Sequence, residues 1–372
     1  MRLFRASRVR VLGVGGELKS TVCSTRGRRA VLMGPVGDLK VPSVYRHFTR
    51  IVSSIMKNDN YRPDVIAHDL HPQYLSTILA KSIGLPCVGV QHHHAHAVSV
   101  MAEWGIDRRV VAICCDGVGY GTDGAAWGGE VLSCDTASFE RRAHLEYFPL
   151  VGGNLAAVET WRPAAALACQ AFGNNWRVDC APIFARIPQL TLELFEQMRT
   201  RALNAPVTSS MGRLFDAVAF LLGICDRNTG LADAASALEA IAVDGRAEPY
   251  PYETRFERGA MIMSPAPMIR GIVRDIAAGH SAAEISARFH ETVARMLSAT
   301  ALMSCDACGL TTVVLAGGCF ANRKLRSRLT QRLEDRHLRV CASRQLLWGD
   351  ETLALGQCIA GAAVSDRVQQ CA

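Results

Sequence analysis

The sequence predicts an α/β protein built from two lobes. Apolar segments with strand character alternate along the chain with amphipathic segments of helical period, and this alternation is typical of the α/β class. The pattern restarts near residue 109. The chain has 372 residues, a length that suits two units with a core each better than one small domain.

The first series of elements runs to about residue 103. Its first strand enters a turn at Gly15-Gly16, Pro63 precedes the second strand, and the third leads directly into a histidine-rich helix. Apolar residues at helical spacing mark the helices between them. In chain order we expect strand 9–15, helix 43–57, strand 64–68, helix 73–83, strand 86–90 and helix 92–103.

The second series repeats strand, glycine-rich turn and helix. A strong strand at 109–115 is followed by an expected loop at 116–124 and a further strand at 129–134. Residues 155–300 have a mostly helical pattern. A last strand at 311–316 enters Gly317-Gly318 and a basic helix that begins near Asn322.

Charge and composition narrow the class of protein. The formal net charge is +7; it would help to attract an anionic substrate or cofactor, but a solvated, mildly basic surface explains it more simply. The basic residues do not form the dense stripe of a dedicated nucleic-acid binder, so no nucleic-acid partner is expected. There is no apolar stretch of 18 residues and no signal-peptide pattern, so we expect no membrane association and a cytoplasmic location.

The 14 cysteines are not expected to form disulfides. Several, such as Cys114, Cys115 and Cys358, have apolar neighbours, and a buried free cysteine behaves as a small hydrophobic residue. Cys305 and Cys308 form a single CxxC with no second pair, a weak pattern for a metal or redox site. The composition therefore fits a reducing compartment.

The segment 91–96 (QHHHAH) is the strongest indication of chemistry. On a helix, His92 and His96 share one face, so both imidazoles can bind one metal ion. No glutamate stands where a zinc metalloprotease needs its general base. A metal site needs further ligands, and Asp116 at a strand end and Asp350 near the C-terminus are candidates.

Two glycine-rich turns indicate phosphate binding. Backbone N–H groups in a tight turn form an anion cradle when no Cβ blocks the approach. Residues 116–124 and Gly317-Gly318 fit this description, although neither matches the P-loop or dinucleotide-binding patterns.

Several long motifs occur in order along the chain. They are 16–19 (GELK), 69–72 (DLHP) with 74–77 (YLST), 90–96 (VQHHHAH) with 101–103 (MAE), 116–124 (DGVGYGTDG) with 127–130 (WGGE), 209–217 (SSMGRLFDA) and 317–323 (GGCFANR). Together they resemble one family, the hydrogenase-maturation carbamoyltransferases called HypF. The resemblance spans roughly residues 8 to 364 and covers only the C-terminal part of HypF.

The resemblance implies an actin-like, two-lobed fold of the sugar-kinase type. The first lobe is expected to comprise residues 8–105, completed by the C-terminal segment 350–368. The second lobe would comprise residues 106–349 and carry a helical insertion.

The resemblance also implies roles for individual residues. It places a metal ion, iron or zinc, on His92, His96, Asp116 and Asp350, and it assigns catalytic roles to His92, Asp116 and Lys19, the last facing the reacting carbonyl. An adenine nucleotide, ATP or AMP as carbamoyl-adenylate, would bind at Gly117, Gly119, Gly121, Gly152, Gly153, Asp216, Gly317, Gly318 and Asn322.

The implied reaction transfers a carbamoyl group from carbamoyl-adenylate to the C-terminal cysteine thiol of a HypE-like protein. The chain lacks the acylphosphatase, zinc-finger and adenylate-forming YrdC-like parts of HypF, so a separate YrdC-like protein is the expected source of the adenylate. Three departures from the family pattern, at Pro35, Asn154 and 230–233, bear on nucleotide affinity and acceptor choice. Two alternatives stay open: an O-carbamoyltransferase acting on a small molecule, and a non-catalytic nucleotide-binding relative.

Overall fold

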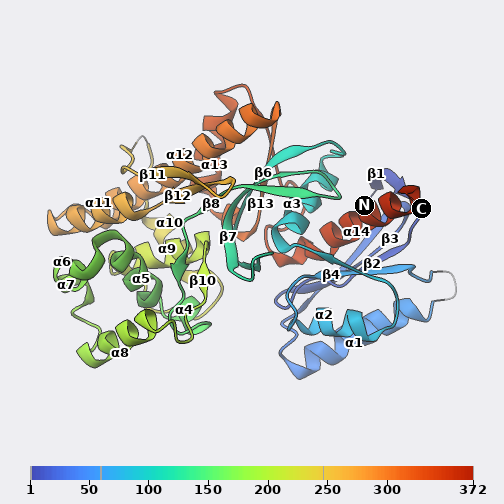
Figure 1. Cartoon of the computed structure of the whole chain (residues 1–372), viewed down its shortest axis with the longest axis horizontal. Helices are drawn as coiled ribbons and strands as arrows, with labels where there is room; N and C mark the ends of the chain where they lie inside the picture. The colour runs from blue at the N-terminus through green and yellow to red at the C-terminus, as the bar shows by residue number, and fades with distance from the viewer. Residues whose placement is uncertain (1, 59–60, 246, 372) are drawn as a thin grey trace.

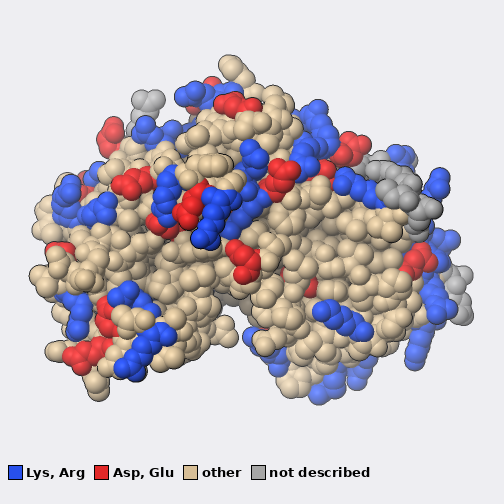
Figure 2. All heavy atoms as spheres, viewed as in Figure 1, with Lys and Arg blue, Asp and Glu red and all other residues tan. Residues whose placement is uncertain are grey.

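The computed structural model describes residues 2–58, 61–245 and 247–371, with side chains described within residues 7–368. Two β-sheets lie in two lobes, and a groove separates the lobes on the face seen in Figure 2. Within the described residues, no helix is long and apolar enough to cross a membrane.

The first sheet has five strands in the order β1-β3-β2-β4-β5. Strand β2 pairs antiparallel with β3 and parallel with β4, which pairs parallel with β5. Strand β3 doubles back on itself and brings Gly34 close to Ser20. A Cβ on Gly34 would lie 3.3 Å from the carbonyl oxygen of Ser20. Gly27 lies between these two residues and has a φ of 57°. The bounds are β1 Arg2–Ser7, β2 Val11–Gly13, β3 Ser20–Gly37, β4 Val65–Asp69 and β5 Cys87–Val90.

The second sheet repeats this topology. Strand β6 pairs antiparallel with β7 and parallel with β13, which pairs parallel with β14, while β8 continues the antiparallel side. Strands β12 and β11 extend the sheet beyond β8, and β9 and β10 form a short side pair. The bounds are β6 Val110–Tyr120, β7 Ala126–Cys134, β8 Phe139–Leu145, β9 Phe148–Pro149, β10 Val207–Thr208, β11 Glu253–Glu257, β12 Ala260–Ser264, β13 Thr312–Ala316 and β14 Arg339–Ala342. The duplicated topology confirms the predicted two-lobed, actin-like α/β fold.

Helices cover the sheets and form three apolar cores. Helices α1 and α2 pack on the outer face of the first sheet, and the inserted helices between β8 and β13 cover the second sheet. The third core lies between the lobes. The bounds are α1 Pro42–Met56, α2 Leu75–Ser82, α3 His92–Glu103, α4 Leu155–Val158, α5 Trp161–Phe172, α6 Trp176–Asp179, α7 Ala181–Phe184, α8 Gln189–Thr200, α9 Met211–Leu221, α10 Asp233–Ile241, α11 Ala266–Ala277, α12 Ala282–Cys308, α13 Arg323–Glu334 and α14 Leu353–Cys371, with short 3-10 turns η1 Gly173–Asn175, η2 Gly318–Ala321 and η3 Asp350–Thr352.

The helix that follows each sheet's last strand crosses to the other lobe. Helix α3 follows β5 of the first sheet and packs against β6 and β13 of the second. Helix α14 follows the second sheet and packs against β2, β3 and β4 of the first. The two helices also pack against each other, and a Cβ on Gly356 of α14 would overlap the carbonyl oxygen of Ala95 in α3. Residues of both helices therefore share the core between the lobes.

The structure corrects one expectation drawn from the sequence. The loop expected at 116–124 is mostly strand, because β6 continues to Tyr120 and pairs with β7, leaving 121–125 as the turn. Residues 155–300 are mostly helical, as expected, and they also contain the short strands β10, β11 and β12. The cysteines with described side chains are all free, as predicted, and Cys305 and Cys308 lie in the last turn of α12.

Candidate metal centre between the lobes

Four side chains from distant parts of the sequence meet where α3, β6 and η3 converge. One ligand atom from each of His92, His96, Asp116 and Asp350 lies within 4.8 Å of all the others. The Nε2 atoms of His92 and His96 are 3.3 and 3.4 Å from Asp116 Oδ2, and 3.7 and 3.6 Å from Asp350 Oδ1. These separations are long for hydrogen bonds. They match the edges, about 3.4 Å, of a tetrahedron whose corners lie about 2.1 Å from a metal ion.

Local structure aims the two imidazoles at the same point. Gln91 caps the N-terminus of α3, and its side chain accepts a hydrogen bond from the His94 N–H at 2.9 Å. The cap starts the helix at His92, so His92 and His96 lie one turn apart on one face. Their rings are 5.0 Å apart and nearly perpendicular.

Asp69 determines which nitrogen of His92 faces the cluster. Its Oδ2 lies 2.8 Å from His92 Nδ1, and both side chains are fully buried. Because a carboxylate only accepts, Nδ1 carries the proton and donates it. When His92 is neutral, as a metal ligand must be, its Nε2 lone pair would point toward Asp116 and Asp350, as in metal sites where a carboxylate orients a ligating histidine.

Two further observations fit a cation at this position. His96 Nε2 is buried and has no hydrogen-bond partner among the described residues, which is costly unless another group satisfies it. Burial opposes ionisation of Asp116, yet the neighbouring imidazoles of His92 and His96 hold the pKa of Asp116 well below its usual range. The same balance lowers the pKa of Asp350. Both carboxylates are therefore ionised at neutral pH, as ligands must be.

Glycines give the cluster its space and orient Asp116. A Cβ on Gly119 would lie 2.6 Å from ring atoms of both His92 and His93. The Gly318 N–H donates to Asp116 Oδ1 at 3.2 Å, which leaves Oδ2 facing the histidines. Gly317 has a φ of 98° and packs on the backbone of Cys115. Gly318 therefore does not join the cluster itself, but its N–H group orients the candidate ligand Asp116.

The other two histidines of the run have different surroundings. His94 Nε2 lies 2.7 Å from the carbonyl oxygen of Asp135 and donates to it. His93 Nδ1 lies 3.2 Å from Gln91 Nε2. Burial lowers the pKa of His93 to about 3, so this imidazole is neutral.

Lys19 lies at the edge of the candidate centre. Its Nζ is 3.1 Å from Glu351 Oε1, next to Asp350 in sequence, and its backbone has a φ of 45°. Gly16, in the same turn, would place a Cβ 3.5 Å from Asp350 Oδ2. The turn 16–19 of the first lobe therefore covers η3, while the ammonium group predicted to face the reacting carbonyl is paired with a carboxylate.

The remaining predicted nucleotide residues are spread over the second lobe. Asp216 is buried in α9, with Oδ2 2.5 Å from Arg213 Nε; burial raises its pKa although Arg213 opposes the shift. The Asn322 amide is used internally, because Oδ1 accepts from Leu325 N and Nδ2 donates to His290 Nε2.

The other predicted glycines have structural neighbours. A Cβ would meet Arg162 at Gly152, Asn204 at Gly153 and Trp127 at Gly121, whereas Gly117 has open space. A Cβ added at Gly152 or Gly153 would meet none of the four clustered side chains. The structure therefore brings Gly119 and Gly318 to the cluster and leaves Gly152 and Gly153 elsewhere.

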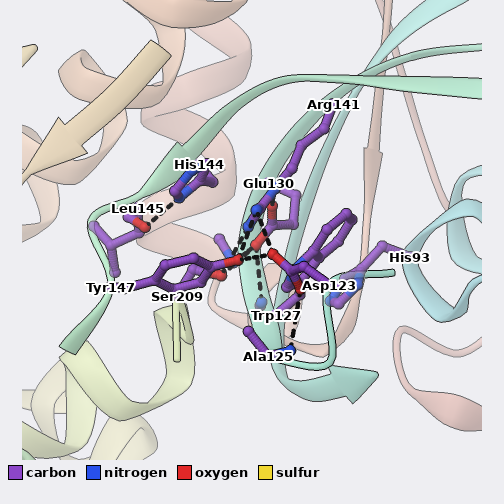
Figure 3. A network of polar contacts seen from close by, with 12 residues as sticks. His93, Asp123, Ala125, Trp127, Glu130, Arg141, His144, Leu145, Tyr147 and Ser209 are labelled. Atoms are coloured by element: carbon purple, nitrogen blue, oxygen red, sulfur yellow. Dashed lines mark hydrogen bonds and ion pairs between the residues drawn. The ribbon is translucent and has the colours of Figure 1, made fainter. Parts of the chain in front are cut away.

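A polar network behind His93 was not anticipated from the sequence. Glu130 is fully buried, pairs with Arg141 at 2.6 Å and accepts from Ser209 Oγ at 2.5 Å. The Arg141 guanidinium lies 3.8 Å from the centroid of the Trp127 ring, which in turn lies near His93. Asp123 and Tyr147 complete the network (Figure 3). It fixes the β6–β7 hairpin against β8 and the start of α9.

With this geometry in place, comparison with known proteins identifies the family. The HypF Kae1-like domain family matches residues 6–103, and its second subdomain, described as a carbamoyltransferase Kae1-like domain, matches residues 112–357. The chain belongs to the HypF family. The first matched segment contains His92 and His96, and the second contains Asp116 and Asp350.

Curated relatives and solved structures agree with this assignment. Carbamoyltransferase HypF2 of Cupriavidus necator is 37% identical over 93% of this chain, which spans 46% of that protein. A shorter protein of the same organism, a carbamoyltransferase HypF homolog, is 36% identical, with 93% of this chain and 90% of that protein covered. The chain spans about half the length of the other HypF proteins compared.

One solved HypF structure superimposes over almost the whole chain. Full-length HypF in its phosphate- and nucleotide-bound form has a TM-score of 0.93 at 35% identity, covering 98% of this chain and 47% of that one. The HypF structure from T. kodakarensis gives a TM-score of 0.88 at 26% identity, covering 99% of this chain and 50% of that one.

Proposed function

We propose that this chain is a carbamoyltransferase of the HypF type, which transfers a carbamoyl group from carbamoyl-adenylate to an acceptor thiol in hydrogenase maturation. The observation that carries the proposal is the cluster of His92, His96, Asp116 and Asp350 at the junction of two lobes that match HypF. The relatives named carbamoyltransferase HypF support the reaction class.

His92, His96, Asp116 and Asp350 would hold a divalent metal, iron or zinc. When bound, such an ion supplies Lewis-acid stabilisation of negative charge on a phosphate oxygen. Asp69 keeps the proton of His92 on Nδ1, and the Gly318 N–H holds the second oxygen of Asp116. Both contacts pre-orient the ligands, so little reorganisation is needed on binding.

The acceptor thiolate would attack the carbamoyl carbon, the bond from that carbon to the phosphate oxygen would break, and AMP would leave. No covalent intermediate with this chain is required. Lys19 would stabilise the developing charge on the carbonyl oxygen, provided that its ammonium group leaves Glu351. Gly117 is next to Asp116 in sequence, and an added Cβ there would meet no atom within 4 Å, so a nucleotide phosphate would have room to approach its backbone.

The expected partners follow from the same proposal. A separate YrdC-like protein would supply the carbamoyl-adenylate, and a HypE-like protein would present its C-terminal cysteine in the cytoplasm. The acceptor would approach the cluster along the groove between the lobes (Figure 2).

The test is to purify the chain with its metal and measure AMP release from carbamoyl-adenylate, with and without a HypE-like acceptor. We expect acceptor-dependent AMP release that is lost in Asp350→Asn, a variant that keeps the side-chain shape. Arg295→Gln, an exposed change on α12, is the control. Release driven only by alcohols or sugars would favour O-carbamoyl transfer, and no release with any acceptor would refute the proposal.

A further inference from the structure

The second lobe carries an arginine-lined cavity between α11 and α12. It lies at the opposite end of the lobe from α3 and α14 (Figure 1), so it is separate from the candidate metal centre. Its volume is about 230 Å³. The chemistry of its wall comes from Arg270, Arg274, Arg288, Asp275 and Tyr250.

The cavity has an excess of positive charge. The wall contains three guanidinium groups and one carboxylate, and that carboxylate already pairs with one of the arginines. Asp275 Oδ2 accepts from the Tyr250 hydroxyl at 2.7 Å and pairs with Arg288. Two positive charges are therefore left without a counterion in the wall.

Hydrogen-bond donors remain unused on all three arginines. A guanidinium group has five N–H donors. Arg270 uses Nη1, toward the carbonyl oxygen of Ala171 at 2.9 Å. Arg288 uses Nε, toward the carbonyl oxygen of Glu248, and Nη1, toward Asp275. The Arg274 guanidinium has no hydrogen-bond or ion-pair partner within the part of the chain that the structure describes, although Arg274 lines the cavity.

The wall holds the donors of Arg288 in place. The Tyr250 ring is 2% exposed, and a Cβ on Gly271 would lie 2.5 Å from its Cδ1, so the ring packs directly on the α11 backbone. The guanidinium carbon of Arg288 lies 4.1 Å from the centre of that ring. Arg288 is thus fixed by an aromatic face, a carbonyl and a carboxylate, which reduces the entropy lost when it binds an anion.

We propose that this cavity binds a phosphate dianion, as inorganic phosphate or as the phosphate of a small phosphomonoester. Two uncompensated positive charges match a dianion, and guanidinium groups bind phosphate oxygens in a bidentate manner. The volume is below the range of about 300 Å³ where pockets for larger ligands begin, so the phosphate group itself, rather than a whole nucleotide, fills the site.

Calorimetric titration of the full chain with inorganic phosphate at low ionic strength tests the proposal. Arg274→Gln removes donors from an exposed side chain without a partner, so the fold should be retained, and we expect a tenfold or greater loss of phosphate affinity. Arg288→Lys, which keeps the charge but not the fork of donors, should also weaken binding. Arg295→Gln, on the same helix as Arg288 and outside the cavity, should leave the affinity unchanged.

Two further experiments distinguish inorganic phosphate from phosphomonoesters as the ligand, and the cavity from the candidate metal centre as the binding site. Glycerol phosphate should compete with inorganic phosphate, whereas AMP should bind the cavity no more tightly than phosphate does. His96→Ala should keep the Arg274-dependent phosphate binding, so this site can be present even if the proposed transferase activity is absent. Absence of phosphate binding to the wild-type chain, or binding unaffected by Arg274→Gln, would overturn the proposal.

Discussion

At the residue scale, His92 is held on both sides of its ring. Nδ1 donates to Asp69, and Nε2 faces the two carboxylates of the cluster. The pairing of His92 with His96 follows from helical spacing alone, and the chain's strand ends indicated Asp116. Asp69 was missed because its contact crosses from the end of β4 to the helix after β5. The signal that could have found it is that both strands end at the same edge of one parallel sheet.

Asp69→Asn should weaken metal binding while leaving the fold intact. The amide is neutral and accepts the Nδ1 hydrogen bond less strongly, so the orientation and basicity of His92 both suffer. We expect a loss of metal affinity of about tenfold or more, measured by competition with a chromophoric chelator. Asp64→Asn, which changes the surface partner of Arg10 just before the same strand, should have the affinity of wild type. Equal affinities for the two variants would contradict this role of Asp69.

Gly119→Ala should displace the imidazoles, whereas Gly117→Ala should not. Both glycines lie in β6, but a Cβ at 119 would lie 2.6 Å from His92 and His93, and a Cβ at 117 meets nothing within 4 Å. Metal content after dialysis should therefore fall only in Gly119→Ala. We also expect that variant to lose about 1–3 kcal/mol of unfolding free energy, as is usual for overpacking. Retention of metal by Gly119→Ala would show that the ring positions are not set by this contact.

At the element scale, buried polar contacts join α12 to the start of α13. His290 Nδ1 lies 2.8 Å from the carbonyl oxygen of Ser286 and donates to it, so Nε2 accepts from Asn322 Nδ2. The Asn322 side chain in turn caps α13. The glycine-turn pattern located the start of this helix, but it could not show that the amide of Asn322 is used within the protein.

His290 should make the protein less stable in acid. Burial lowers the pKa of His290 from 6.5 to about 4, so between these values the unfolded chain binds a proton that the folded chain does not. The stabilisation is complete above pH 6.5 and is lost as the pH falls toward 4. The loss is about 3 kcal/mol for a shift of this size. Urea unfolding at pH 7 and pH 4 gives the free energy of unfolding at each pH. We expect this free energy to fall less between pH 7 and pH 4 in His290→Gln than in wild type. An equal fall in the two proteins would exclude His290 as the source of acid sensitivity.

Local patterns predicted the elements with clear periodicity and missed those without it. Helices α1 and α3 and strands β4, β5 and β13 lie within two residues of their expected bounds. The continuation of β6 through Gly117 and Gly119 was mistaken for a loop, because glycine has low strand propensity. Pairing with β7 supports that segment instead. Strand β11 is exposed along its length, so it carries no apolar alternation to recognise.

At the scale of the whole molecule, the two lobes share one arrangement of strands, and each is closed by a helix from the other. The strand–helix restart predicted two units. That restart alone could not predict the exchange of α3 and α14, because pairing between distant segments is decided by packing in three dimensions. Only the resemblance to HypF implied that the C-terminal segment 350–368 completes the first lobe.

Gly356→Ala tests that exchange. In an ordinary helix this change stabilises by roughly 1 kcal/mol, but here the new Cβ would overlap the carbonyl oxygen of Ala95. We expect destabilisation instead, together with weaker metal retention, because separating α3 from α14 moves His92 and His96 away from Asp350. Thermal unfolding and metal analysis give the two readouts. A higher melting temperature would mean that the helices are not in close contact.

The exchange of closing helices also bears on the order in which the molecule is completed. During synthesis the first sheet emerges before the second lobe, but α14, which covers its inner face beside α3, follows that lobe in the chain. Until α14 docks, apolar residues of the first sheet stay uncovered, and Asp350, directly before α14, is not held opposite the histidines. Assembly of the candidate metal centre therefore coincides with burial of the inter-lobe core, so a ribosome-bound chain stalled before residue 350 would carry the histidine pair without a finished site.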